Sequence, residues 1–189
     1  MTHNEDEKIL TAFRAVHQLH RDISLILMDT DRFTNGIGWT LFKNKNQCHG
    51  ESTAIIDGSS KWMPRRFFRI YENESFSNLL IYLSVIIDGE QNEQNFEKPL
   101  ISVGIIDYGK GSKIDNWDWD YPHAANWNDD EPIEFGQWHK VEKTGFPTND
   151  HKAETISYFS HPLTAISGAK ELTANLHEPL VEKLNEYIS

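Results

Sequence analysis

The residue types best suited to specific chemistry gather in one irregular stretch, residues 107–134. This stretch holds eight acidic and two basic residues, together with three tryptophans and two tyrosines. Aromatic faces flanked by carboxylates attract cations, so such a segment can dock a lysine or arginine side chain of a partner protein, or a cationic ligand. We predict a partner-binding or ligand-binding site made of six residues, namely Trp117, Asp118, Trp119, Asp120, His123 and Trp127.

Three other interpretations of the same stretch remain open. Tryptophan rings could stack on sugars while the carboxylates accept hydrogen bonds from sugar hydroxyls. Closely spaced Asp and Asn oxygens are also ligands that suit Ca²⁺. Alternatively, the segment folds back as a flap that buries its tryptophans and leaves its acids in solvent. Because long loops in compact domains are more often functional than short ones, docking is the function we put first.

Histidines in the second half of the chain suggest a competing function of a different class. His123, His139 and His151 lie among many carboxylates, and zinc hydrolases use histidine and carboxylate ligands with one open position. None of these histidines falls in a recognisable ligand spacing, and a single cysteine cannot supply a Cys-x-x-Cys pair. A metal-dependent hydrolase is therefore the alternative, while the leading hypothesis involves no metal and no cofactor.

A third function is suggested by His20, which lies inside the apolar stripe of a predicted N-terminal helix. The residue is either a buried neutral histidine with a satisfied hydrogen bond or a group that contacts a ligand beneath the helix. The second alternative would make the protein a small-molecule sensor with a pocket between helix and sheet. No nucleophile elbow, phosphate-binding loop or dinucleotide fingerprint is present, so the sequence leans against an enzyme.

Composition disfavours several classes of partner. The formal net charge of −11 repels phosphate backbones and anionic lipid surfaces, so we expect no binding to nucleic acids or membranes. The longest apolar run, 79–87, is far shorter than the roughly 20 residues that span a bilayer. One cysteine cannot form an internal disulfide, and the first residues are polar and acidic, unlike a signal peptide. We therefore expect a soluble cytoplasmic protein, and its oligomeric state is left open.

The elements that must position these residues begin with a long amphipathic helix over 5–28. Apolar residues recur along it with helical period at Ile9, Phe13, Val16, Ile23 and Leu27. Acidic residues in the first turn suit the positive end of the helix dipole. We expect this stripe to lie on a sheet, and we expect residues 29–38 to form the helix end and a turn.

Two segments predict the centre of that sheet. Residues 79–87 and 100–106 are almost continuously apolar, which is typical of strands covered on both faces. The polar residues between them indicate an exposed loop that joins an antiparallel pair. Shorter strands are expected at 39–43, 53–56, 66–71, 133–141 and 154–159. The polar stretch 44–51 is expected to be a turn.

The C-terminal part of the chain predicts two helices. Residues 163–176 carry apolar side chains at helical spacing, and Pro179 suits the first residue of a last helix. The whole chain, 1–189, is thus expected to form one α+β domain with a long N-terminal helix, a central mostly antiparallel sheet of five to seven strands, and two C-terminal helices. Its leading function is a non-enzymatic interaction module that docks a basic partner protein or cationic ligand through the acidic, tryptophan-rich segment.

Overall fold

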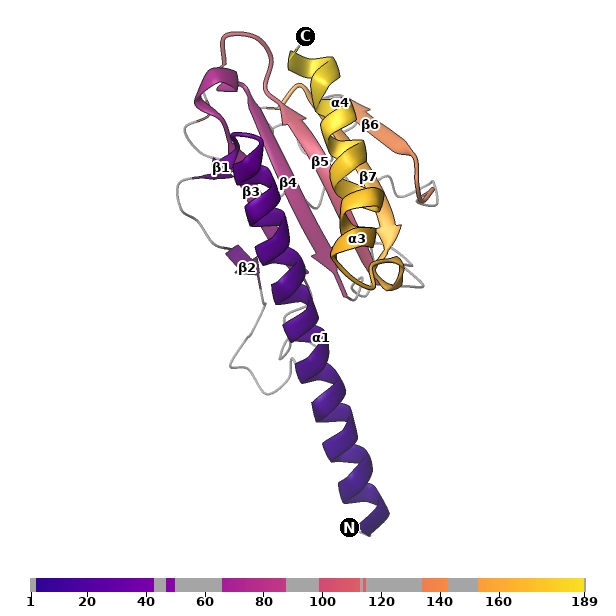
Figure 1. Ribbon diagram of the computed structural model, residues 1–189. Coiled ribbons are helices and arrows are strands. Elements are labelled where there is room, and N and C mark those ends of the chain that lie inside the picture. Colours follow the sequence, from indigo (N-terminus) through magenta and orange to yellow (C-terminus); the bar gives the residue numbers. More distant parts are fainter. Residues whose placement is uncertain are drawn as a thin grey trace, which may run out of the picture.

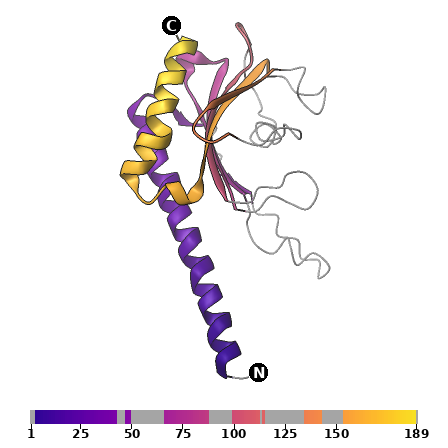
Figure 2. The ribbon, with the colours of Figure 1, turned by 90° about the vertical axis from the view of Figure 1, so that its right-hand side faces the viewer.

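The computed structural model describes residues 3–42, 47–49, 66–87, 99–112, 114, 134–142 and 153–188. It has the predicted α+β architecture: a long N-terminal helix, a central antiparallel sheet and helices at the C-terminal end (Figure 1). In the perpendicular view the helices all lie on one face of the sheet (Figure 2). The layout therefore has two layers, with the helices packed on one side of the strands.

Helix α1 spans His3–Gly36 and continues well past its predicted end at residue 28. The helix end falls within the range 29–38 predicted for a helix end and a turn, but the chain stays helical as far as Gly36 because the threonines there fit the helix. Thr30 and Thr34 donate hydroxyl hydrogen bonds of 2.9 Å to carbonyls four residues earlier, and both side chains are buried. The helix ends only at the glycines, where Gly38 adopts a positive φ of 84°.

Within the described ranges, seven strands form one antiparallel sheet in the order β1-β3-β4-β5-β7-β6, with β2 also paired to β3. The strands are β1 Thr40–Leu41, β2 Gln47–His49, β3 Arg66–Glu72, β4 Leu79–Ile86, β5 Leu100–Asp107, β6 Trp138–Glu142 and β7 Thr155–Pro162. Most of these match the predicted ranges. Strand β2 is a correction, since it pairs with β3 where the sequence predicted only a turn. The predicted strand 53–56 lies outside the described residues.

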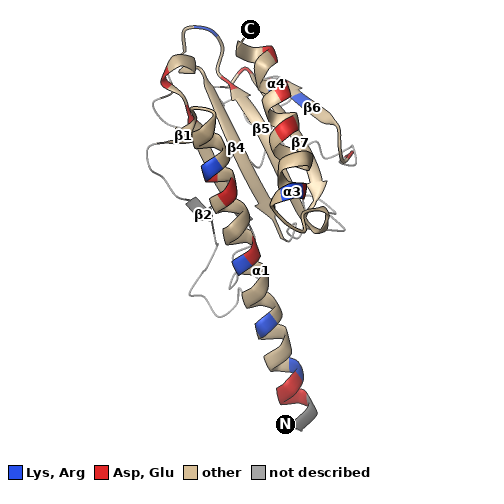
Figure 3. Ribbon diagram, in the orientation of Figure 1, with Lys and Arg blue, Asp and Glu red and all other residues tan. Residues whose placement is uncertain are grey.

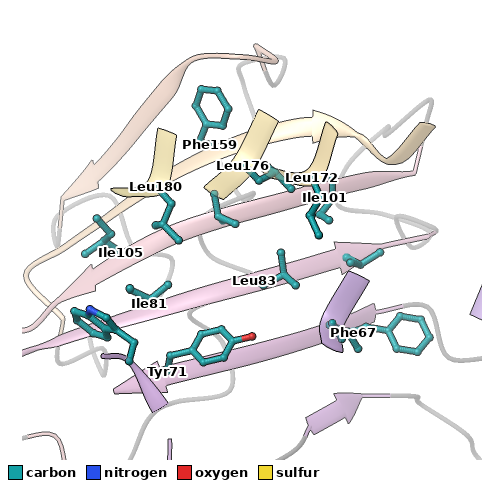
Figure 4. Close-up of a cluster of buried hydrophobic side chains, with 14 of the residues drawn as sticks. Phe67, Tyr71, Ile81, Leu83, Ile101, Ile105, Phe159, Leu172, Leu176 and Leu180 are labelled. Carbon is teal, nitrogen blue, oxygen red and sulfur yellow. The ribbon is translucent and has the colours of Figure 1, made fainter. Parts of the chain in front are cut away.

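The two central strands, β4 and β5, confirm the prediction drawn from their continuous apolar sequences. Every residue of β4 is buried, and so is every residue of β5 except its last. One core cluster lies between the sheet and the helices, and Figure 4 shows its side chains reaching from both layers. A second cluster lies on the other face and includes Phe68, Tyr82, Ile106 and Tyr158.

The C-terminal helices are nearly continuous. A short 3-10 turn, Leu163–Ala165, leads to α3 (Ala169–Leu172), then to a π-helical turn (Thr173–His177) and α4 (Glu178–Ile188). Pro179 has no N–H, and its ring would clash with the carbonyl four residues earlier. The wider π turn before α4 avoids that clash, and Glu178 N–H bonds to Thr173 O, five residues back.

Across the described ranges, each helix is too short or too polar to traverse a bilayer.

Candidate interaction surface on helix α1

The N-terminal part of α1 projects beyond the sheet as a free helix (Figure 1). Leu19 is the first residue of α1 whose side chain packs against the core cluster. We call residues 5–18 the overhang. Three of its large apolar side chains are exposed: Ile9 by 46%, Leu10 by 50% and Phe13 by 70%. A helix surface of this kind is typical of a docking face rather than of ordinary surface.

The overhang continues the same stripe that the sheet buries farther along the helix. Ile23 and Leu27 are only 1% and 2% exposed, and they lie one and two heptads beyond Val16 and Phe13 on the helix. The prediction that the whole stripe lies on the sheet is therefore wrong for its N-terminal half. The physical reason is length, because the strands end before the helix does.

The point where α1 leaves the sheet is marked by His20 and Phe67. The two rings meet edge to face with their centroids 5.6 Å apart. His20 is thus partly buried against an aromatic ring of β3. Its Nε2 is buried and has no hydrogen-bond partner in the described part of the chain. The expectation of a satisfied hydrogen bond at this histidine therefore finds no support among these residues.

One polar contact fixes the C-terminal half of α1 to strand β3. The Tyr71 hydroxyl donates a 2.8 Å hydrogen bond to Oδ1 of Asp31, and Nε of Arg69 lies 3.5 Å from the same oxygen. Burial, together with the neighbouring Asp31 carboxylate, raises the pKa of Tyr71 above its ordinary value. The tyrosine therefore remains a neutral donor, and the contact locks helix to strand.

A second contact fixes α1 to the C-terminal helices. The His177 ring stacks on Phe33, with centroids 4.1 Å apart and an interplanar angle of 9°, and its Nε2 lies 3.2 Å from the Thr30 hydroxyl oxygen. Thr30 already donates its hydroxyl proton to Ile26 O, so it accepts from His177. His177 is therefore a neutral ring that carries its proton on Nε2. Burial lowers its pKa to about 4, against a smaller opposing effect of Asp29.

Charges are distributed unevenly along the overhang (Figure 3). Acidic residues fill the first turn, including Glu5 and Asp6. Basic residues follow within the overhang at Lys8 and Arg14, and beyond it Arg21 is followed directly by Asp22. The first turn is therefore negative, while the rest of the overhang carries two positive charges.

A groove of about 360 Å³ lies on another side of α1, between this helix and the residues that lead into α3. Its walls include Ile26, Ile166 and Leu172, together with Asp22 and Asp29. Both carboxylates already have side-chain partners, because the Gln18 amide donates to Asp22 at 2.8 Å and Arg32 pairs with Asp29 at 2.9 Å. His20 does not line this groove, so it is not the sensor pocket predicted beneath the helix.

The site predicted from the tryptophans lies outside the described residues. This holds for all of its members: Trp117, Asp118, Trp119, Asp120, His123 and Trp127. The last described residue before the segment is Ile114, which packs against the core cluster on the second face of the sheet. The prediction for these six residues therefore remains one made from sequence.

Of the three histidines predicted for the alternative metal site, only His139 lies among the described residues. His139 stacks on Tyr158 with centroids 5.1 Å apart, and its Nε2 lies 3.0 Å from Glu134 O. His123 and His151 lie outside the described residues. Within the ranges that the structure describes, no group of three or more His, Cys, Asp or Glu side chains is arranged to hold a metal ion.

Comparisons with protein-family models, with curated proteins and with solved structures find no match to this chain. Function is therefore inferred from the geometry of the described residues. Among them, the exposed stripe of the overhang is the feature that the rest of the fold leaves unexplained.

Proposed function

We propose that this protein is a non-enzymatic interaction module that docks an amphipathic helix of a partner protein on the overhang of α1. One observation carries the proposal: Phe13 is 70% exposed although it belongs to a stripe whose other half is fully buried. Single exposed apolar residues are normal on protein surfaces. Three within five residues, on one helix and continuous with the core, form a binding surface.

The energetic gain from covering this surface is substantial. Full burial of one large apolar side chain stabilises by roughly 1.5–3 kcal/mol. Covering the exposed parts of Ile9, Leu10 and Phe13 therefore favours association by a few kcal/mol before the costs of association are subtracted. A partner helix with its own apolar stripe can cover all three, because such helices contact one another along i, i+3 and i+4 positions.

The fold presents this surface in a fixed conformation. Asp31–Tyr71 and Thr30–His177 hold the C-terminal half of α1, while the overhang extends from it as uninterrupted helix. A short isolated helix would be marginally stable in water. Here the docked half nucleates the free half, so binding does not have to form the helix from a disordered chain.

The acidic, tryptophan-rich segment is the second docking element that we propose. Trp117, Trp119 and the carboxylates between them would hold a basic partner protein or a cationic ligand by cation–π and charge interactions. This part of the proposal rests on sequence alone. It concerns a different surface from the overhang, so the two elements can be tested separately.

Site-specific photo-crosslinking tests the overhang directly. A photoreactive phenylalanine analogue replaces Leu10 in one variant and Thr11 in a matched control, each expressed in the native cell. At 3.6 residues per turn, Thr11 lies about 200° around the helix from Ile9. We expect a discrete crosslinked product from position 10 and none from position 11. Equal labelling at both positions, or no discrete product at either, would contradict docking on this face.

A further inference from the structure

We propose that the groove between α1 and the start of α3 binds an aliphatic diamine, with one ammonium group at each of two carboxylates and the carbon chain on the apolar floor between them. This site is separate from the overhang and from the tryptophan-rich segment. It adds a small-molecule ligand to the docking of partner proteins, and it does not depend on that proposed function.

The charge of the groove selects a cation. Among the described residues that line it, the only charged ones are Asp22 and Asp29, and both belong to α1. They lie seven residues apart in the sequence, which is about 10.5 Å along a helix and brings them to the same side of it. The groove therefore presents two separated negative charges and suits a ligand with two separated positive ones.

Both carboxylates can accept a further hydrogen bond. Each takes one from a side chain of its own helix, Gln18 at Asp22 and Arg32 at Asp29, whereas a carboxylate has about four acceptor sites. The Arg32 side chain is 72% exposed, and exposed ion pairs of this kind contribute little free energy. A ligand ammonium can therefore join the existing partner at Asp22 and join or replace the one at Asp29.

Apolar side chains separate the two carboxylates. Leu25 and Ile26 lie between them on α1, and Ile166 and Leu172 belong to the opposite wall. Leu25 is 50% exposed whereas Leu172 is 1% exposed, so the groove leads from an open rim to the buried core. An alkyl chain is stabilised by contact with such a surface. A bare metal cation would leave this floor uncovered, which favours a diamine as the ligand.

The opposite wall leaves room for the ligand. Ser167, Gly168 and Ala169 line it with small side chains, and the groove volume of about 360 Å³ is typical of small-ligand sites. A methyl group on Gly168 would meet only Oε2 of Glu171, at 3.6 Å. The backbone of Gly168 is extended, with a φ of 178°. A larger residue at this position can therefore fill the groove without straining the chain.

Two-dimensional NMR of the nitrogen-labelled full chain, titrated near neutral pH, tests the site with three probes. Octamethylenediamine can reach both carboxylates, tetramethylenediamine is too short, and octylamine has the longer chain with one ammonium group. We expect octamethylenediamine to shift the amide signals of Leu25, Ile26 and Ala169, and to bind about fivefold more tightly than octylamine. Tetramethylenediamine should bind most weakly. Equal affinities for the three probes, or no shifts at these amides, would overturn the inference.

Two variants test the two walls separately. Asp22→Asn combined with Asp29→Asn should lose the preference for octamethylenediamine over octylamine. Gly168→Leu changes no charge and should abolish the binding of both probes, because its side chain occupies the groove. Asp6→Asn combined with Glu7→Gln is the matched control, since it removes the same charge from the overhang and should bind like the unaltered chain. Circular dichroism verifies that each variant is folded.

The acidic, tryptophan-rich segment could also attract a diamine, so Trp117→Ala combined with Trp119→Ala is titrated in parallel. We expect this variant to keep the shifts at α1 and α3. Loss of those shifts here, or an unchanged preference in Asp22→Asn with Asp29→Asn, would show that the diamine is held elsewhere and that the inference is wrong. Crosslinking from position 10 is measured separately, so failure at the groove leaves docking on the overhang standing.

Discussion

The Tyr71 hydroxyl donates a 2.8 Å hydrogen bond to the Asp31 carboxylate, which joins strand β3 to helix α1 across 40 residues of sequence. Arg69, two residues before the tyrosine, lies close to the same carboxylate. Asp31 therefore faces the sheet from within a helix, at a position where the sequence predicted a turn. This contact helps to hold the docked half of α1, and hence to fix the direction of the overhang.

Replacement of Tyr71 by phenylalanine measures the strength of this contact. We expect Tyr71→Phe to lower the free energy of unfolding by about 1.5 kcal/mol or more, because the acceptor is charged and loses its donor. Tyr82→Phe is the matched control. The Tyr82 hydroxyl is fully buried and has no hydrogen-bond partner among the described residues, so its removal should leave stability unchanged or raise it.

Urea denaturation of both variants checks this prediction. The two changes delete the same atom from a buried tyrosine, so a difference in their effects reports the bond to Asp31. Equal losses in Tyr71→Phe and Tyr82→Phe would show that this bond contributes nothing specific.

Gly104 makes room for Tyr82 at the centre of the sheet. It lies opposite Tyr82 on β4 and opposite Tyr158 on β7. A methyl group on Gly104 would fall 2.6 Å from the carbonyl oxygen of Ser157 and would overlap the Tyr82 ring. Neither the backbone of β7 nor a fully buried ring can give way easily.

We therefore expect Gly104→Ala to lower the free energy of unfolding by about 3 kcal/mol. The matched control is Gly36→Ala, where no atom lies within 4 Å of the added methyl. That variant should be neutral or more stable by about 0.4–1 kcal/mol. Thermal unfolding compares the two. If Gly104→Ala unfolds at the temperature of the unaltered chain, the tight contact at the sheet centre is not rigid.

The layers of this fold could be predicted because most of the elements carry a clear apolar pattern. Residues 79–87 and 100–106 are continuous apolar runs that water could not solvate, and the structure buries both at the centre of the sheet. Strand β2 was missed because its residues, Gln47–His49, are polar. Their strand conformation comes from backbone pairing with β3, which side-chain pattern does not reveal.

The sequence did not predict that the overhang is exposed, and the lengths of the strands and of helix α1 explain why. A strand of eight residues spans about 27 Å, whereas a helix of 34 residues spans about 51 Å. No sheet built from such strands can cover the whole stripe of α1. The apolar pattern alone cannot say which half is covered, because the residues of both halves have the same period. Contacts between distant parts of the chain, such as Asp31–Tyr71, decide which half of the stripe is covered.

The pH dependence of stability is expected to report His177. Burial lowers the pKa of this histidine to about 4 in the folded chain, from an ordinary 6.5. Between these values the unfolded chain binds a proton that the folded chain does not. Stability should therefore be full above about pH 7 and should fall as the pH drops from 6.5 towards 4.

His177→Gln isolates this effect, because the amide can still donate to Thr30 but does not titrate in this range. We expect the variant to lose part of the slope of unfolding free energy against pH between 4 and 6.5. His161→Gln serves as comparison, since burial also lowers the pKa of that partly exposed histidine. An unchanged slope in His177→Gln, measured by urea denaturation at several pH values, would show that the ring does not stay neutral in the folded chain.

Substitutions in the tryptophan-rich segment can separate the two docking elements. Trp117→Ala combined with Trp119→Ala should weaken binding of an oligolysine peptide by about tenfold or more, because two cation–π contacts of roughly 1 kcal/mol or more each are lost. The paired variant Asn116→Ala with Asn128→Ala alters the same segment without removing an aromatic ring, and should bind as before. Isothermal titration calorimetry measures both.

Crosslinking from position 10 of the overhang should be unaffected in each of these variants, because Phe13 and Ile9 belong to a different surface. Conversely, Phe13→Glu should abolish the crosslink from position 10 without weakening the binding of oligolysine. If the double tryptophan variant stays folded and binds oligolysine as tightly as the unaltered chain, the segment does not hold cations through its rings. If the same variant also loses the crosslink from position 10, the two elements are parts of one surface.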